Sequence, residues 1–127
     1  MKKTSYSAVV LNKNSRKRLI NRFKSEIPED WELIAHHMTI NLGEIYPEYE
    51  KYLGLSIQLS VNDIAMDDKV IAVGVSGFYS KNKKSHITIA INRKAGGKSM
   101  MANNLTNWKE LKRPIVVFGK VTEIEYK

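Results

Sequence analysis

The sequence predicts a single α+β domain, residues 1–127, with about six strands and one or two helices. At 127 residues the chain has the length of one domain and should bury roughly two-thirds of its unfolded surface. Short runs rich in Val, Ile and Thr, several of them alternating with polar residues, recur along the chain and are typical of strands. No internal linker divides the sequence.

The N-terminal part predicts a strand followed by a helix. Residues 5–11, SYSAVVL, are short, apolar and rich in Val. Residues 12–15 then offer helix-capping side chains, and Pro28 disfavours helix at the residue before it, so the helix should end near Ile27. The apolar residues that recur at helical spacing between these limits are Leu19, Ile20, Phe23 and Ile27.

The rest of the chain alternates predicted strands with polar connections. Two connections have some helical character: residues 44–52 form a loop, with room for one helical turn, and residues 100–108 form a short helix. The last strand is expected to begin at Pro114, since proline is tolerated at the first residue of a strand. The predicted strands are residues 31–43, 53–61, 69–78, 86–92 and 114–125.

Charge and composition narrow the class of protein. The 21 Lys and Arg outnumber the 13 Asp and Glu, and the net charge of +8 favours a polyanionic partner such as a nucleotide or nucleic acid, although excess charge also serves solubility. Without cysteine the chain has no disulfide and no thiolate site. The N-terminal apolar run is too short for a signal peptide, and no stretch is long enough to span a membrane, so we expect a cytoplasmic protein that does not associate with membranes.

Two predicted strands carry the same polar motif, His-x-Thr. It occurs as His37 and Thr39 in HMTI, and as His86 and Thr88 in HITI. Because side chains alternate along a strand, each strand presents an imidazole and a hydroxyl on one face. If the strands lie side by side, this set suits phosphodiester cleavage: one neutral imidazole accepts a proton, the other, protonated, donates one, and the threonines bind non-bridging oxygens. Core histidines beside β-favouring threonines are the structural alternative.

The third histidine, His36, falls on the Met38 face if the strand is regular, so we interpret it as a packed or tautomer-fixing residue. A zinc site built from histidine alone would need all three imidazoles, yet His36 and His37 point to opposite faces of a regular strand. The sequence therefore predicts no metal site and no cofactor.

With these motifs the chain resembles the 2H phosphoesterase superfamily, which is defined by two His-x-Thr motifs. The segments YSAVVL, WELIAHHMTINLG, HITIAINRKAGGK and NLTNW are similar, in that order, to the phage anti-CBASS cyclic-oligonucleotide phosphodiesterases. The resemblance implies a bilobed fold, with two antiparallel sheets flanking a central cleft, and His37, Thr39, His86 and Thr88 as the catalytic set. It also implies an enzyme that opens cyclic di- or trinucleotide messengers by 2'-hydroxyl attack on 3'-5' linkages, and so counters antiphage defence in the host cytoplasm.

Five further residues are predicted to bind the substrate. An aromatic ring at the start of the first strand can stack on a base or touch the phosphate, as in the phage group, and a tryptophan can stack likewise. Basic residues bracket the second motif and suit an anionic ligand, although ordinary packing and solvated loops also explain such side chains. The predicted substrate-binding residues are Tyr6, Lys84, Arg93, Lys94 and Trp108.

Two other functions fit the same sequence. An RNA end-repair enzyme would use the same four residues to hydrolyse a terminal 2',3'-cyclic phosphate on RNA ends. A noncatalytic nucleotide- or RNA-binding module would depend on the basic surface alone, would tolerate loss of the histidines, and would bind more weakly as salt rises. The sequence leaves open the accepted bases and linkages, the acid and base roles of the histidines, and the oligomeric state.

Overall fold

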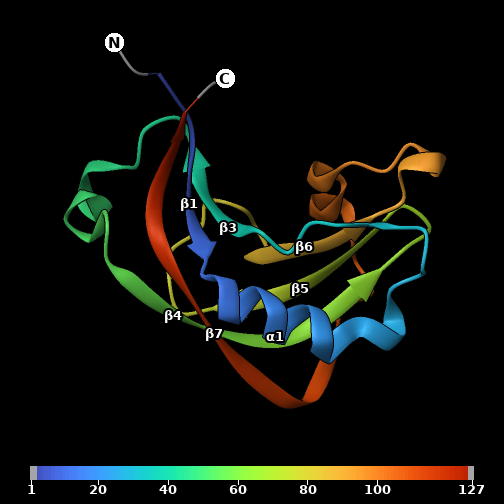
Figure 1. Ribbon diagram of the computed structural model, residues 1–127. Helices are drawn as coiled ribbons and strands as arrows, with labels where there is room; N and C mark the ends of the chain where they lie inside the picture. Colours follow the sequence, from blue (N-terminus) through green and yellow to red (C-terminus); the bar gives the residue numbers. More distant parts are fainter. Residues whose placement is uncertain (1–2, 126–127) are drawn as a thin grey trace.

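The computed structural model describes residues 3–125, so residues 1, 2, 126 and 127 of the predicted domain lie outside the described part. Figure 1 shows a structure dominated by long, curved strands. Its strands are β1 (Thr4–Leu11), β2 (Glu32–Leu33), β3 (His37–Leu42), β4 (Ser56–Met66), β5 (Val70–Ser76), β6 (His86–Ile91) and β7 (Lys109–Glu125). Its helices are α1 (Lys13–Phe23) and the 3-10 helices η1 (Lys24–Glu26), η2 (Pro47–Tyr52), η3 (Arg93–Ala95) and η4 (Ser99–Asn104).

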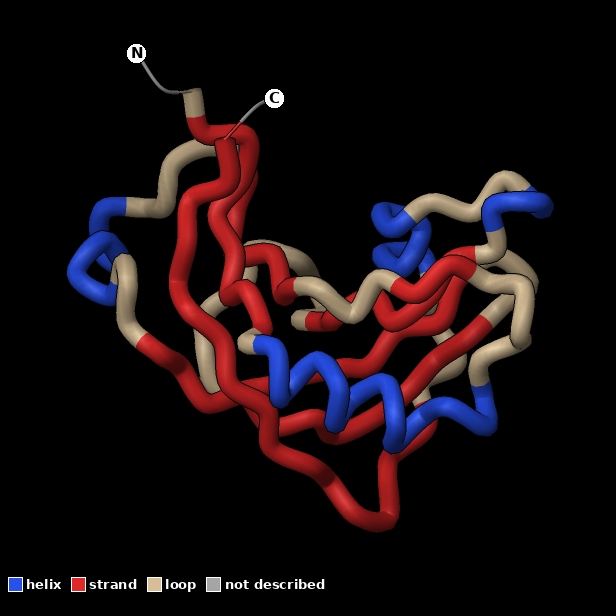
Figure 2. Tube along the Cα trace, viewed as in Figure 1, coloured by secondary structure: helices blue, strands red, loops and turns tan. Residues whose placement is uncertain are grey.

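The predicted α+β class, with its bilobed arrangement of two antiparallel sheets and a central cleft, is wrong, because the structure is mostly sheet. Six strands form a closed antiparallel barrel in the order β6, β3, β1, β7, β4 and β5, and the pairing of β5 with β6 closes it. The short strand β2 is an addition that pairs with β6. Figure 2 shows that helices are few beside the strands. Within residues 3–125, α1 is the one α-helix. Side chains alternate between the two faces of a strand in the same way in an open sheet and in a barrel, so the local pattern did not predict closure.

The predicted first strand and helix are confirmed. β1 pairs with both β3 and β7, and α1 begins after Asn12, whose side chain accepts a hydrogen bond of 2.8 Å from the Ser15 N–H. This satisfies one of the N–H groups that a helix start leaves unpaired. The helical backbone continues through η1 and stops at Glu26, ahead of Pro28. Ser15 also fastens α1 to the barrel, since its hydroxyl accepts from the Phe118 N–H of β7 at 2.8 Å.

The predicted strand over residues 31–43 is two strands, β2 and β3. Both lie along the same partner, but the register changes between them: Leu33 pairs with Ala90, whereas Met38 pairs with Ile87. Two extra residues are therefore accommodated between these pairs. The backbone absorbs them at Ala35, which has a φ of 42°, in the left-handed region that residues other than glycine rarely adopt.

The last strand also differs from its prediction, because β7 begins at Lys109 rather than at Pro114. Pro114 lies inside the strand, between the pairs Ile115 with Val61 and Glu110 with Asp63. The intervening residues leave the ladder to β4, so the missing N–H of proline costs no ladder hydrogen bond there.

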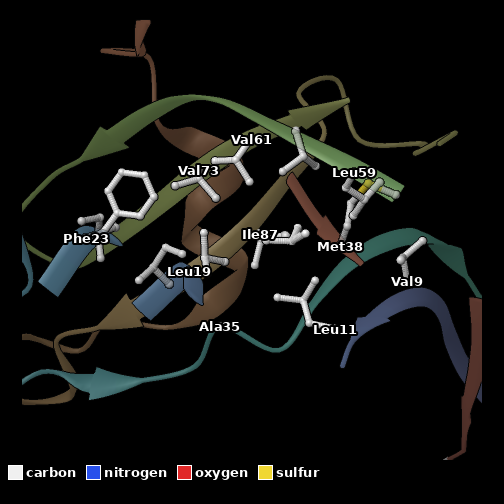
Figure 3. Close-up of a cluster of buried hydrophobic side chains, with 14 of the residues drawn as sticks. Val9, Leu11, Leu19, Phe23, Ala35, Met38, Leu59, Val61, Val73 and Ile87 are labelled. Carbon is white, nitrogen blue, oxygen red and sulfur yellow. The ribbon is translucent and has the colours of Figure 1, made fainter. Parts of the chain in front are cut away.

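The main core fills the inside of the barrel. All six barrel strands contribute, largely at alternate positions, and α1 adds Leu19 and Phe23 (Figure 3). A second, smaller cluster lies on the outward face of β5 and β6, where Ala102 and Leu105 of the η4 region pack on Val70, Ala72 and Ile91. The outward face of β6 is therefore partly covered, which matters for the polar residues on it. No helix within residues 3–125 is long and apolar enough to cross a membrane.

Candidate active site

The pairing of β3 with β6 brings the two His-x-Thr motifs together. Met38 pairs with Ile87, and both side chains are fully buried in the core. Because antiparallel partners face each other, the residues on either side of this pair are opposed: His37 with Thr88, and Thr39 with His86. Alternation places all four on the outward face of the barrel. Two imidazoles and two hydroxyls thus share one patch of the sheet surface, which we call the His/Thr face.

His37 is partly buried on this face between two other rings. Its Nδ1 lies 2.9 Å from Nδ1 of His36, and its ring centroid lies 5.0 Å from that of Tyr6, which comes from the neighbouring strand β1. Burial, and after it the nearby charges of His36 and His86, together lower the pKa of His37 from its ordinary value to about 4. His37 is therefore a neutral imidazole at neutral pH.

His86 is more deeply buried, with 7% of its surface exposed. Its Nδ1 lies 2.8 Å from the Lys84 carbonyl oxygen, and since a carbonyl only accepts, this nitrogen carries the proton. Burial lowers the pKa of His86, while the hydrogen bond to the Lys84 carbonyl raises it in partial opposition. Both motif histidines are thus held through Nδ1. Within residues 3–125, neither Nε2 atom has a hydrogen-bond partner, so Nε2 is the nitrogen open to a ligand on each ring.

The two threonines differ in how their hydroxyls are used. Thr88 is 8% exposed, and its hydroxyl donates a long hydrogen bond of 3.3 Å to the Ser99 carbonyl oxygen of η4. The Thr39 side chain is partly buried. The backbone carbonyl of Thr39 accepts a hydrogen bond of 2.7 Å from the Ser80 hydroxyl, which ties the loop between β5 and β6 to β3. Both hydroxyls are suited to contact an anion, but Thr88 must first release a weak internal bond.

A charged group borders the His/Thr face beside His86. Lys84 donates from Nζ to Oδ2 of Asp63 at 2.5 Å and lies 4.9 Å above the Trp108 ring. The register places Asp63 beside Gly74, and Gly74 beside His86. A Cβ on Gly74 would lie 1.8 Å from Oδ1 of Asp63 and 2.7 Å from Cε of Lys84. The bare backbone at Gly74 therefore leaves the space in which this ion pair rests.

The predicted substrate-binding residues fall into two groups. Tyr6 lies beside His37, and Lys84 and Trp108 border His86, so these three adjoin the His/Thr face. Arg93 and Lys94 follow the opposite end of β6 and are not brought to it.

At that end, the Arg93 guanidinium makes two hydrogen bonds to the Glu32 carboxylate, at 2.8 and 2.9 Å, and Lys94 lies 3.7 Å from Asp30. Their charges are matched by neighbouring carboxylates.

His36 does not lie on the Met38 face, so that expectation is wrong. Met38 is fully buried, whereas His36 is exposed and its ring meets His37. The register change at Ala35 is the physical reason, because the strand alternation that the expectation required is interrupted there. Within residues 3–125 no group of three or more His, Cys, Asp or Glu side chains is placed to hold a metal ion.

Sequence reasoning missed Asp63, Gly74 and Ser99 as neighbours of the motifs. A glycine inside an apolar strand often marks the close approach of another group, so Gly74 did carry a signal. Asp63 and Ser99 had none, since their positions depend on long-range pairing.

No protein-family model matches the chain, and no curated protein sequence matches it. The functional interpretation therefore rests on the two motifs and on the geometry of the His/Thr face.

Proposed function

We propose that this protein is a metal-independent phosphodiesterase that cleaves cyclic di- or trinucleotides. The observation that supports the proposal is the pairing of Met38 with Ile87, from which antiparallel register puts His37 opposite Thr88 and Thr39 opposite His86. Two imidazoles with free Nε2 atoms, flanked by two hydroxyls, provide the groups that acid–base cleavage of a phosphodiester requires.

The hydrogen bonds of the two histidines favour different roles. His37 is the base, because burial and neighbouring charge keep its imidazole neutral. Burial lowers the pKa of His86, but the hydrogen bond from its Nδ1–H to the Lys84 carbonyl partly offsets this lowering, so we assign His86 as the acid. A general acid and a general base each contribute about 10²- to 10⁴-fold to the rate.

The proposed ring opening is a displacement at phosphorus. The ribose 2'-oxygen forms a bond to phosphorus while the bond from phosphorus to the 5'-oxygen breaks. His37 Nε2 takes the proton of the 2'-hydroxyl, and His86 Nε2–H gives a proton to the departing 5'-oxygen. The product is a linear oligonucleotide with a 2',3'-cyclic phosphate at one end and a 5'-hydroxyl at the other. Water can open the cyclic phosphate in a second step with the two roles reversed.

The surroundings of the His/Thr face suit a nucleotide. Tyr6 beside His37 and Trp108 beyond Lys84 offer rings on which bases can stack, and the net charge of +8 attracts a polyanion. The preference for a cyclic messenger over a linear RNA end comes from the resemblance to the phage enzymes. By that resemblance the protein acts in the host cytoplasm, where it removes a cyclic-oligonucleotide defence signal.

The test is turnover with EDTA present, on cyclic di- and trinucleotides with 3'-5' and 2'-5' linkages and on a linear RNA ending in 2',3'-cyclic phosphate. Wild type is compared with His37→Ala and His86→Ala, and with Arg93→Gln as a matched change outside the His/Thr face. We expect ring cleavage that falls by about 10²-fold or more in each histidine variant and is unchanged in Arg93→Gln.

Two other outcomes would point to the alternative functions. Cleavage of the linear end alone would replace the proposal with RNA end repair. Binding that persists in both histidine variants, weakens steeply with salt and occurs without turnover would replace it with a noncatalytic binding module.

A further inference from the structure

His36 and His37 are adjacent in the chain, yet their side chains meet. On a regular strand neighbouring side chains point to opposite faces, and their Nδ1 atoms could not approach. Here the two Nδ1 atoms lie 2.9 Å apart, with ring centroids at 5.1 Å and ring planes 82° apart. The left-handed φ of 42° at Ala35 is the local distortion that turns His36 toward its neighbour.

This distorted segment is firmly held. The Ala35 N–H donates to the Thr88 carbonyl at 2.9 Å, and the His36 carbonyl accepts from the Leu11 N–H at 2.9 Å. Ala35 is fully buried. A non-glycine residue held in the left-handed region is strained, and such strain persists only where surrounding contacts enforce it. The contact between the two imidazoles is thus built into the backbone rather than left to a mobile side chain.

A contact between two Nδ1 atoms holds a single proton. With no proton two lone pairs would face each other, and with two the hydrogens would collide, so one ring donates and the other accepts. We propose that His36 is a positioning residue whose Nδ1 accepts the Nδ1–H of His37, which leaves the lone pair of His37 on Nε2. His36 thus accepts the Nδ1–H and fixes the tautomer, as a carboxylate does beside a catalytic histidine, but His36 does so as a neutral group.

The direction of donation follows from the reaction cycle. When His37 takes a proton at Nε2, both of its nitrogens carry hydrogen, so His36 must be the acceptor for the contact to survive. The charged or titratable groups that face the pair are compatible with this. Burial, and after it the charge of Arg16 from α1, lower the pKa of His36 and so help to keep it neutral. His86 and Tyr6 face His37 from β6 and β1.

The tautomer can be measured without any substrate, by ¹⁵N NMR of the imidazole nitrogens at neutral pH. We expect Nδ1–H on His37 in the wild type. His36→Asn places an amide oxygen at the position of the lost Nδ1 and should keep this tautomer, whereas His36→Phe keeps a ring without an acceptor and should lose it. Nε2–H on His37 in the wild type would overturn the inference. Folding of both variants is checked from the dispersion of the same spectra.

The kinetic consequence rests on the proposed function. Because the proposed role of His36 is exerted through His37, we expect His36→Phe to lower kcat by about tenfold, as for the loss of one hydrogen bond, with KM little changed. His36→Asn should restore most of the rate. Equal losses in both folded variants, or a loss in neither, would overturn the positioning role.

The two proposals can fail separately. If the NMR spectra show the Nδ1–H tautomer in wild type and its loss in His36→Phe, the shared proton stands even if no nucleotide is cleaved. If cleavage is seen with the wrong tautomer, the function stands and the role of His36 falls.

Discussion

Acidification should destabilise the wild-type protein more than a His37→Gln variant, which cannot titrate at this position. The pKa of His37 is about 4 in the folded protein and about 6.5 in an unfolded chain. Between these values the unfolded chain binds more protons, so stability is highest above pH 6.5 and falls as the pH drops toward 4. At about 1.4 kcal/mol per pH unit, His37 alone should account for a loss of about 3 kcal/mol.

The assay is urea denaturation of both proteins at about pH 7.5 and about pH 4.5, followed by tryptophan fluorescence. The difference in the free energy of unfolding, variant minus wild type, should rise by about 2 to 3 kcal/mol from the higher to the lower pH. Carboxylate titration is common to both proteins and cancels in this difference. Parallel pH dependence in the two proteins would refute the burial of His37. Repeating the measurement in about 1 M salt separates the causes of the lowered His37 pKa, because salt screens the charges of His36 and His86 but leaves burial unaffected.

Two further substitutions probe the surroundings of the His/Thr face. In Gly74→Ala the new methyl group would collide with Asp63 and Lys84, so we expect a loss of about 1–3 kcal/mol in urea denaturation together with weaker turnover, and an unchanged midpoint would contradict the close packing. In Arg93→Gln only the exposed pair with Glu32 is lost, so stability should change by less than about 1 kcal/mol and turnover should persist; loss of turnover would mean that Arg93 reaches the substrate after all.

Local structure was largely predictable because it follows from short-range rules. Apolar spacing at Leu19 and Phe23, capping residues at 12–15 and the break before Pro28 predict a helix that ends near Ile27. The structure has α1 and η1 over this range, with Asn12 as the cap. The strand break at Ala35 was not predictable, since alanine carries no signal for a left-handed conformation. That one residue decided where His36 lies.

Long-range pairing was beyond the local pattern. Alternation in HMTI and HITI places each imidazole with its threonine, but the opposition of the two motifs depends on the register of β3 with β6. The barrel was missed for the same reason, since closure requires that β5 meet β6 and that β7 lie between β1 and β4. Arg93 and Lys94 lie near the second motif in sequence but beyond the far end of its strand. Proximity in sequence was therefore a poor guide to the substrate-binding residues.

The position of β7 has a consequence for how the chain reaches this structure. Its 17 residues pair on one edge with β1 and on the other with β4, so the strand nearest the C-terminus joins the first strand of the chain. During synthesis β1 and β4 therefore remain open edges until residues 109–125 have left the ribosome. Contacts this distant in sequence slow folding, and open strand edges invite association with other chains. Premature termination within β7 should yield aggregating chains rather than a shorter folded protein.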